Sequence, residues 1–264
     1  MESTTGFRPH SHTHGAGYGE AEASFDQVRR AERYYGIQLR KIARHVGDII
    51  TAFEVGSPQA DALIRRAMER YAELLQPWAQ ATAAGMLADV TRRDAKVWRN
   101  ITEGMGSTMR DYIRSAPLAP VLAELEGEQV RLITSLPLEA AERVHKLMVE
   151  GLYNATRASE IAKEIMRSGE VTESRANLIA RTEVGRASGK ITETRALHVG
   201  SEGYIWRTVG DADVRHDHRL LNGKFIRYDS PPIADKKSGT RAHAGCIWNC
   251  RCYQEPVIPQ LYRA

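Results

Sequence analysis

Long apolar runs are the first thing that this sequence lacks. No apolar stretch approaches the ~20 residues that a membrane-spanning helix needs, and the first residues lack the charged-then-apolar layout of a secretory signal peptide. We therefore expect a protein that is made and kept in the cytoplasm and has no membrane anchor.

Cysteine is scarce, and its placement disfavours a disulfide framework. The chain has three cysteines, Cys246, Cys250 and Cys252, an odd number within seven positions. A reducing compartment rarely preserves disulfides. Metal ligation or simple burial is therefore the better interpretation, and a disulfide from Cys246 to either of the other two stays a third one.

The usual catalytic signatures are missing as well. The chain has no glycine-rich phosphate loop, no Ser-His-Asp order with supporting context and no His-Glu-x-x-His motif. We therefore predict that the protein is not an enzyme.

A strong excess of one charge is also absent, because the formal net charge is only +4. Three of these charges lie from Ser201 onward, which permits contact with nucleic acid but also suits an ordinary solvated surface.

Helical periodicity is what the sequence does contain. The chain has 264 residues, 42% of them hydrophobic, and can bury a large core. From Phe25 to Phe53, apolar residues recur every three or four positions, as on one face of a helix. Further helices are predicted over about residues 58–74, 78–101, 107–115, 121–133, 137–152, 160–166 and 172–198. We expect residues 21–156 to form a helical domain that serves as a packed scaffold.

Serine, proline and glycine predict where these helices begin and end. Ser57 before Pro58, and Ser135 before Pro137, each suggest a cap followed by a proline in the first helical turn. Gly169 is predicted to end a short helix. Residues 1–20 carry His10, His12 and His14 among small polar residues, so we expect a flexible or partner-bound arm; their spacing would also suit a stray metal ion.

Glu183 lies on the apolar stripe of the helix predicted from Thr172 to His198. An unpaired buried carboxylate is costly, so Glu183 needs a partner. Arg181 is on a different face of the same helix. We expect Glu183 to reach a basic residue nearer the C-terminus, Arg215, or else to be half exposed.

The stretch from Tyr204 to Pro256 holds every cysteine and most of the β pattern. Its runs 204–208, 224–228 and 251–257 are rich in aromatic and β-branched residues and are separated by turn residues. We predict a small antiparallel sheet there. The expected fold class is mainly α, a long-helix array followed by a small C-terminal α+β subdomain.

Histidines and cysteines in this stretch suggest a metal site. Zinc is held by about four nitrogen or sulfur ligands. The candidate set is His218, His243, Cys250 and Cys252, with Cys246 as a substitute. If Cys250 and Cys252 lie on a strand, they point to the same side and Arg251 points to the other.

Two other interpretations of the same residues stay open. In one, the site is a hydrogen-bonded core in which Arg215 and His218 hold backbone carbonyls and Asp211, while the cysteines are small buried apolar residues. In the other, His216, Asp217 and His218 serve a metal-dependent nuclease, with Asn222 and His243 nearby in sequence. Adjacent side chains on a strand or turn point in opposite directions, which weighs against the nuclease.

The C-terminal motifs resemble a known family. The order Asp-x-x-Val-Arg-x-x-His-x-x-Leu-x-Gly, then His-Ala-Gly and Asn-Cys-Arg-Cys, is similar to phage Mu protein F-like minor head proteins. The matching residues are Asp211, Val214, Arg215, His218, Leu221, Gly223, His243, Gly245, Asn249, Cys250, Arg251 and Cys252, with the stretches 175–183 and 204–208 upstream. The resemblance covers about residues 159–259 strongly, and we expect residues 157–264 to form the Mu F-like domain.

The resemblance implies a structural protein that joins the procapsid near the portal and stays inside the filled head. Implied partners are the portal protein, a major capsid or scaffolding protein, and packaged double-stranded DNA bound without sequence preference; a role in DNA packaging or ejection is also implied. In some members, the positions of Arg215 and His218 resemble a Cys-x-x-Cys pair. An arginine there cannot ligate a metal. A toxin-like group transferase joined to the head domain is a third hypothesis, and we expect no such module because the chain ends soon after Cys252.

Overall fold

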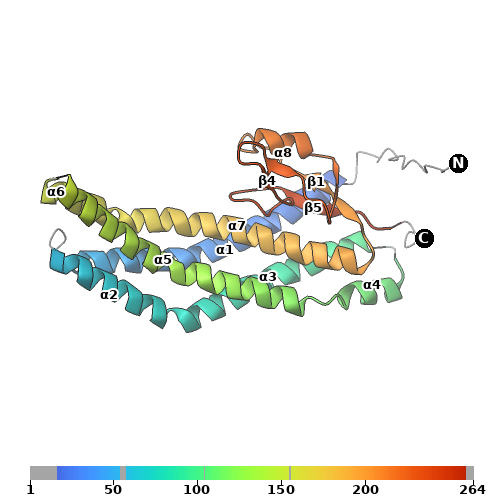
Figure 1. Cartoon of the computed structure of the whole chain (residues 1–264). Coiled ribbons are helices and arrows are strands. Elements are labelled where there is room, and N and C mark those ends of the chain that lie inside the picture. Colours follow the sequence, from blue (N-terminus) through green and yellow to red (C-terminus); the bar gives the residue numbers. More distant parts are fainter. Residues whose placement is uncertain (1–16, 54–57, 104, 155, 260–264) are drawn as a thin grey trace.

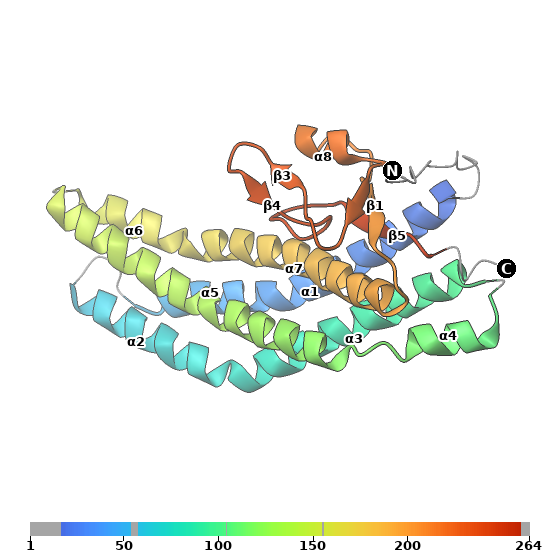
Figure 2. The same ribbon diagram turned by 45° about the vertical axis from the view of Figure 1, so that its right-hand side comes forward.

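Seven helices form an elongated bundle in the computed structural model, which describes residues 17–53, 58–103, 105–154 and 156–259 (Figure 1). The helices are α1 (Gly17–Thr51), α2 (Pro58–Leu74), α3 (Gln76–Ile101), α4 (Ser107–Arg114), α5 (Ala119–Tyr153), α6 (Ala158–Met166) and α7 (Ser168–His198). The strands and a short helix, α8 (His216–Leu221), lie together on one side of the bundle in both views (Figure 2). The predicted fold class is confirmed.

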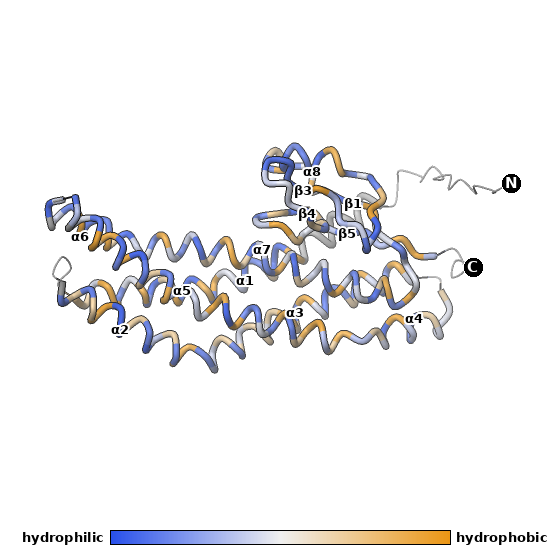
Figure 3. The backbone as a smooth tube through the Cα atoms, in the orientation of Figure 1, coloured by the Kyte–Doolittle hydropathy of each residue, from blue (hydrophilic) through white to orange (hydrophobic). Residues whose placement is uncertain are grey.

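The bundle is held together by apolar stripes that turn inward. Leu39 and Val46 of α1, Ile133 of α5 and Ile179 of α7 belong to one buried core, and apolar segments recur along each helix (Figure 3). This core continues through α6 and α7 as far as Ile191. Helix α6 and α7 as far as Ile191 therefore pack with the bundle, although the sequence grouped them with the C-terminal domain.

Helix α5 corrects one predicted boundary. It runs without a break from Ala119 to Tyr153, with Pro137 inside it. The Ser135 hydroxyl donates to the Leu132 carbonyl at 2.9 Å, so it is not a cap of a new helix. Proline removes one backbone donor from a helix, but Ile133 and Leu136 before it and Ala140 after it pack into the core and keep the helix continuous.

The break between α6 and α7 lies at Arg167, which ends one helix and precedes the next. Gly169 is therefore inside the first turn of α7 and does not end a helix. A Cβ at this position would lie 3.3 Å from the Cα of Gly47, so the glycine permits close approach of α7 to α1. Ser57, the other predicted cap, and residues 1–16 of the predicted arm lie outside the described residues.

Three strands form the predicted antiparallel sheet. The strands are β1 (Gly203–Arg207), β2 (Phe225–Arg227) and β5 (Tyr253–Pro256), in the order β2-β1-β5. Tyr204 pairs with Ile226 on one side and with Pro256 on the other. A second hairpin, β3 (Ile233–Asp235) and β4 (Thr240–Arg241), lies in a stretch for which no strand was predicted.

A second core joins this sheet to the bundle. Tyr204 and Trp206 of β1 are fully buried, and Trp98 of α3 and Ile113 of α4 pack in the same cluster. The sheet is thus anchored on the end of the bundle formed by α3, α4 and α7. No helix among the described residues is both long and apolar enough to cross a membrane.

Candidate metal centre

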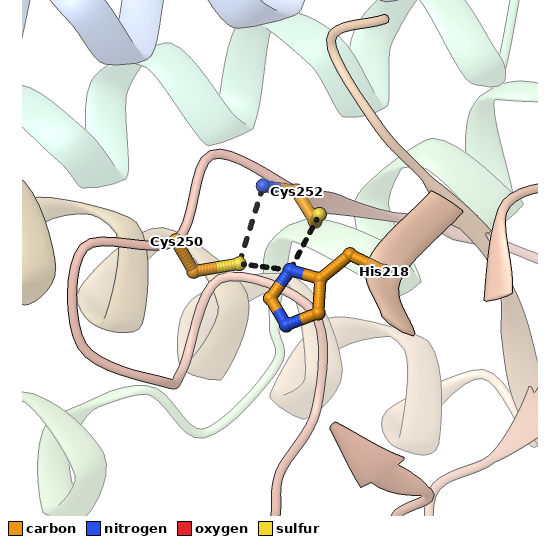
Figure 4. A group of neighbouring side chains, drawn as sticks. All are labelled: His218, Cys250 and Cys252. Carbon is orange, nitrogen blue, oxygen red and sulfur yellow. Dashed lines mark hydrogen bonds between the residues drawn. The ribbon is translucent and has the colours of Figure 1, made fainter. Parts of the chain in front are cut away.

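The side chains of His218, Cys250 and Cys252 converge at one point (Figure 4). His218 is on α8, and the two cysteines lie in the loop that leads into β5. All three are buried, with at most 6% of the residue exposed. One ligand atom from each lies within 4.8 Å of the other two, so residues more than thirty positions apart in sequence meet at one point.

The spacing of these three atoms suits a tetrahedral metal. The Nδ1 atom of His218 is 3.5 Å from the Cys250 sulfur and 3.4 Å from the Cys252 sulfur. Zinc bonds of about 2.1 Å to nitrogen and about 2.3 Å to sulfur place two tetrahedral ligands about 3.6 Å apart. A single Nδ1 lone pair can accept a hydrogen bond from only one of the two thiols. The spacing therefore suits a shared cation, and it also suits hydrogen bonds among the three groups.

Among the described residues, three candidate ligands converge, and Arg215 is a cationic neighbour of this group. Arg215, at the N-terminal boundary of α8, donates to the Trp248 carbonyl at 2.7 Å. The free ring nitrogen of His218, Nε2, is buried without a hydrogen-bond partner among the described residues. Ligating histidines usually donate this second N–H to a carbonyl or carboxylate. The donor set fits zinc in kind and spacing, whereas the unpartnered Nε2 departs from this usual arrangement.

The loop that contains Cys250 and Cys252, here called the cysteine loop, has one residue in the left-handed backbone conformation and is hydrogen-bonded to α7. Asn249 has φ 58°, its backbone N–H donates to the Thr182 hydroxyl at 3.0 Å, and its side chain accepts from Arg181 at 2.8 Å. This conformation is less costly for asparagine than for most other residues. Both contacts hold the turn that brings Cys250 and Cys252 round to His218.

Arg251 points away from the two sulfurs, as alternation predicts, although these residues precede the strand. Its guanidinium pairs with Asp211 at 2.8 Å and with Asp213 at 2.9 Å. One interpretation of the sequence had Arg215 and His218 holding Asp211, whereas in the structure this carboxylate pairs with Arg251. These ion pairs hold the segment before α8 against the cysteine loop. The two segments that contain the candidate ligands are therefore joined on the outside of the cluster as well.

Glycines allow the loop to lie directly on α7. A Cβ on Gly185 would be 3.1 Å from the Gly245 carbonyl oxygen, and a Cβ on Gly245 would be 3.1 Å from the Gly185 carbonyl oxygen. Gly245 also has φ +84°, which disfavours any side chain. The backbones of α7 and of the cysteine loop therefore pack directly against each other at these two glycines.

The electrostatics favour one thiolate before any metal is bound. The pKa of Cys250 is lowered, first by its hydrogen bond with Cys252 and then, against the cost of burial, by His218. The pKa of Cys252 is raised by the same shared hydrogen bond and by burial. Ionising both sulfurs in this buried place therefore needs a further positive charge, which a divalent cation would supply.

His243 is not part of the cluster, which differs from the predicted ligand set. Its Nε2 lies 3.1 Å from the Tyr228 carbonyl and its Nδ1 lies 3.2 Å from the Tyr204 hydroxyl. The Tyr204 oxygen in turn accepts from the Ala244 N–H at 3.0 Å. Burial lowers the pKa of His243. Both ring nitrogens are thus used in a neutral hydrogen-bonded core, and none is left for a metal.

Cys246 also lies apart from the other two cysteines. Its sulfur faces the Ala244 carbonyl at 3.8 Å, and burial raises the pKa of its thiol to about 12. All three cysteines are free, so the structure contains neither of the disulfides considered from the sequence. A protonated Cys246 is a poor substitute ligand.

Glu183 is buried, but its predicted partner was wrong. It accepts a hydrogen bond of 2.7 Å from the Gln129 side chain of α5, and Arg186 lies 3.9 Å away. Gln129 is itself fully buried and accepts from the Tyr35 hydroxyl at 3.0 Å. Burial raises the pKa of Glu183. The hydrogen-bond partner is thus an uncharged residue inside the bundle, whereas Arg215 binds the backbone of the cysteine loop.

The residues of the nuclease hypothesis are not gathered into one site. His216 is exposed, whereas His218 is buried among the sulfurs. Asp217 accepts from the Lys236 backbone N–H at 3.0 Å, and the Asn222 side chain accepts from the Thr208 N–H at 3.0 Å. Because α8 is a helix, consecutive residues project about 100° apart, and these side chains serve separate structural contacts.

Sequence reasoning missed the residues that position the cluster. Trp206 packs edge-on against His218 with ring centroids 5.4 Å apart, and Thr182 holds the Asn249 turn. Trp206 lies in a run predicted as a strand, and Asn249 directly precedes Cys250. Their role depends on contacts between distant segments, which no local pattern encodes.

The structure is thus a helical bundle that carries a small sheet, with one histidine and two cysteines gathered beside the sheet. The model of the family described as phage Mu protein F like protein matches residues 142–255, a stretch that includes all three candidate ligands. This part of the chain is therefore phage Mu protein F-like, which confirms the resemblance recognised in the sequence.

Two curated proteins are similar to this chain. An uncharacterized protein of Haemophilus influenzae is 26% identical over 248 residues, which are 87% of this chain and 54% of that protein. The NAD(+)–arginine ADP-ribosyltransferase EFV of Enterococcus faecalis is 28% identical over 169 residues, which are 61% of this chain and 34% of that protein. The chain thus spans about half and about a third of these relatives. No solved structure matches it significantly.

Proposed function

We propose that this protein is a structural minor head component of a tailed bacteriophage that acts during procapsid assembly near the portal. The observation that carries the proposal is the phage Mu protein F-like match over residues 142–255, which indicates a phage head morphogenesis protein and a place in the virion. The long bundle supports the finer role because its helices offer extended surfaces to partner subunits.

Within this role, the His-Cys-Cys cluster would act as a metal clamp, with zinc as the favoured ion. His218, Cys250 and Cys252 would hold it, and the metal would supply the positive charge that two buried thiolates need. The clamp would join α8 to the loop before β5, two segments that lie far apart in the sequence. The cation would stabilise this end of the molecule without taking part in a chemical step.

The assembly role is tested by co-purification with the portal protein encoded in the same genome, and with procapsids formed from the full set of head proteins. We expect the wild-type chain to sediment with procapsids and to capture the portal protein. A chain that stays with the soluble fraction and captures neither portal nor capsid protein would contradict the role. Turnover of plasmid DNA with magnesium or manganese would instead favour the nuclease hypothesis.

A further inference from the structure

A groove between α1 and α3 is lined entirely by charged side chains. Its volume is ≈ 290 Å³. The lining consists of five cations and one carboxylate, namely Arg30, Arg92, Arg93, Lys96, Arg99 and Asp89. It is distinct from the smaller cleft beside the cysteines, although Arg93 borders both.

Most of the positive charge in this groove is uncompensated. Asp89 pairs with Arg92 at 3.1 Å and with Arg93 at 2.8 Å. Within the described part of the chain, no ion pair engages Arg30, Lys96 or Arg99, and all three are exposed. Like charges three or four residues apart on a helix repel each other, so α3 presents a face that an anion would stabilise.

The positive surface continues past the end of α3. Arg99 also lines a neighbouring groove of ≈ 130 Å³ together with Arg110 and Arg114 of α4. Asp111 pairs with Arg114, and Glu103 is exposed between the two helices, but cations still outnumber carboxylates. From Arg92 to Arg99 the helix rises about 10 Å, which equals the axial rise of about three phosphates of one DNA strand.

We propose that this basic groove binds the phosphate backbone of duplex DNA without sequence preference. Arginine side chains match the geometry of phosphate oxygens, and here they are spaced along one helix face. A protein partner is less suited, because the groove lining has no aromatic or aliphatic residue to form the apolar centre that such interfaces need. The inference rests on the proposed head role, since packaged DNA is the polyanion that the protein would meet there.

The test compares three forms of the full-length protein. The groove variant replaces Arg30, Lys96 and Arg99 with glutamine. The control variant makes the same change in net charge on α2 and α5, with Arg66→Gln, Arg131→Gln and Lys146→Gln, all exposed residues. Binding to a fluorescent 30-bp duplex of random sequence is measured by anisotropy at several salt concentrations, and circular dichroism checks that every form is folded.

We expect the wild type to bind with an affinity that falls steeply with salt. The groove variant should bind at least about tenfold more weakly at low salt, and its log–log salt slope should be smaller by about 3, near 0.9 for each phosphate that is no longer neutralised. The control variant should retain most of the affinity. Equal reductions of affinity in both variants, no binding by the wild type, or tighter binding of polyglutamate than of DNA would each overturn the proposal.

The test of DNA binding by the groove can fail or succeed independently of the test of procapsid assembly. Both variants are also tested for co-sedimentation with procapsids, which are assembled before DNA enters. A groove variant that joins procapsids normally but fails to bind DNA supports both proposals. A wild type that joins procapsids and does not bind DNA overturns only the groove.

Discussion

At the scale of single residues, two histidines of the same subdomain show how neighbours decide a role. His218 directs Nδ1 at two sulfurs, whereas His243 uses both nitrogens in hydrogen bonds to Tyr228 and Tyr204. The sequence predicted both histidines as metal ligands, and it could not show that one of them is hydrogen-bonded in the core instead. The distinction depends on where the tyrosines lie, and these come from two different strands or their ends.

Replacing His243 with phenylalanine should destabilise the protein without removing the metal site. The change removes the contacts of the Tyr204 O–H and of the Tyr228 carbonyl with the imidazole, although the Tyr204 oxygen still accepts from the Ala244 N–H. Losing them costs about 1–3 kcal/mol. Urea unfolding should therefore show a lower free energy of unfolding, while the zinc content stays that of the wild type. Loss of bound metal in His243→Phe would show that this histidine is a ligand after all.

A buried ion pair missed by sequence reasoning, Asp94 of α3 with Arg195 of α7, should be sensitive to pH. The two side chains are 2.7 Å apart. Burial raises the pKa of Asp94 to about 6, although Thr192 and Arg195 oppose the shift. The folded state therefore takes up this proton more readily than the unfolded chain, and the contribution of Asp94 to stability grows as pH falls from about 7 to 4.

Comparison with Asp94→Asn isolates this contribution from that of other carboxylates. The stability advantage of the wild type over Asp94→Asn should increase by about 1–3 kcal/mol between pH 7 and pH 4.5. The measurement is urea unfolding of both proteins at each pH. An advantage that stays constant, or that shrinks toward low pH, would mean that the pKa of Asp94 is not raised.

At the scale of elements, periodicity predicted most of the helices and the three-stranded sheet, because each depends on residues close in sequence. The helix boundaries predicted at Pro137 and Gly169 were wrong, because they were inferred from the local preferences of proline and glycine without knowledge of tertiary packing. Pro137 lies inside α5, whose flanking residues are buried, and Gly169 serves contact with α1. Helix α8 was missed because six residues are too few to show a period.

The contact between α7 and the cysteine loop should tolerate no side chain at Gly185. In Gly185→Val, the new Cβ would meet the Gly245 carbonyl oxygen at 3.1 Å, and backbone cannot move aside as a flexible side chain can. We expect the free energy of unfolding to fall by about 1–3 kcal/mol and metal retention to weaken, because the loop that carries both cysteines must shift.

Gly127→Ala is the matched control for this substitution. Gly127 is also helical, in α5, but a Cβ there meets no atom within 4 Å. Alanine should raise stability by about 0.5–1 kcal/mol through its higher helix propensity. Thermal melts of the two variants should thus move in opposite directions. Equal melting temperatures for Gly185→Val and the wild type would show that the loop does not rest on α7 as closely as described.

At the scale of the whole molecule, two cores meet along α3 and α7. One belongs to the bundle, and the other joins the sheet to Trp98 and Ile113. The sheet end combines the His-Cys-Cys cluster with the basic groove on α1 and α3. The second core therefore fixes the small subdomain on the bundle, and the proposed metal clamp would fasten two segments within that subdomain, α8 and the loop before β5.

The most direct test of the clamp is the metal content of the full-length protein, purified without chelators under reducing conditions. Plasma mass spectrometry should find about one zinc per chain in the wild type and almost none in the double variant Cys250→Ser, Cys252→Ser, whose bundle helices should persist by circular dichroism. The variant Cys246→Ser should keep its zinc. A wild-type protein that is folded yet binds no zinc, even after incubation with the ion, would contradict the clamp.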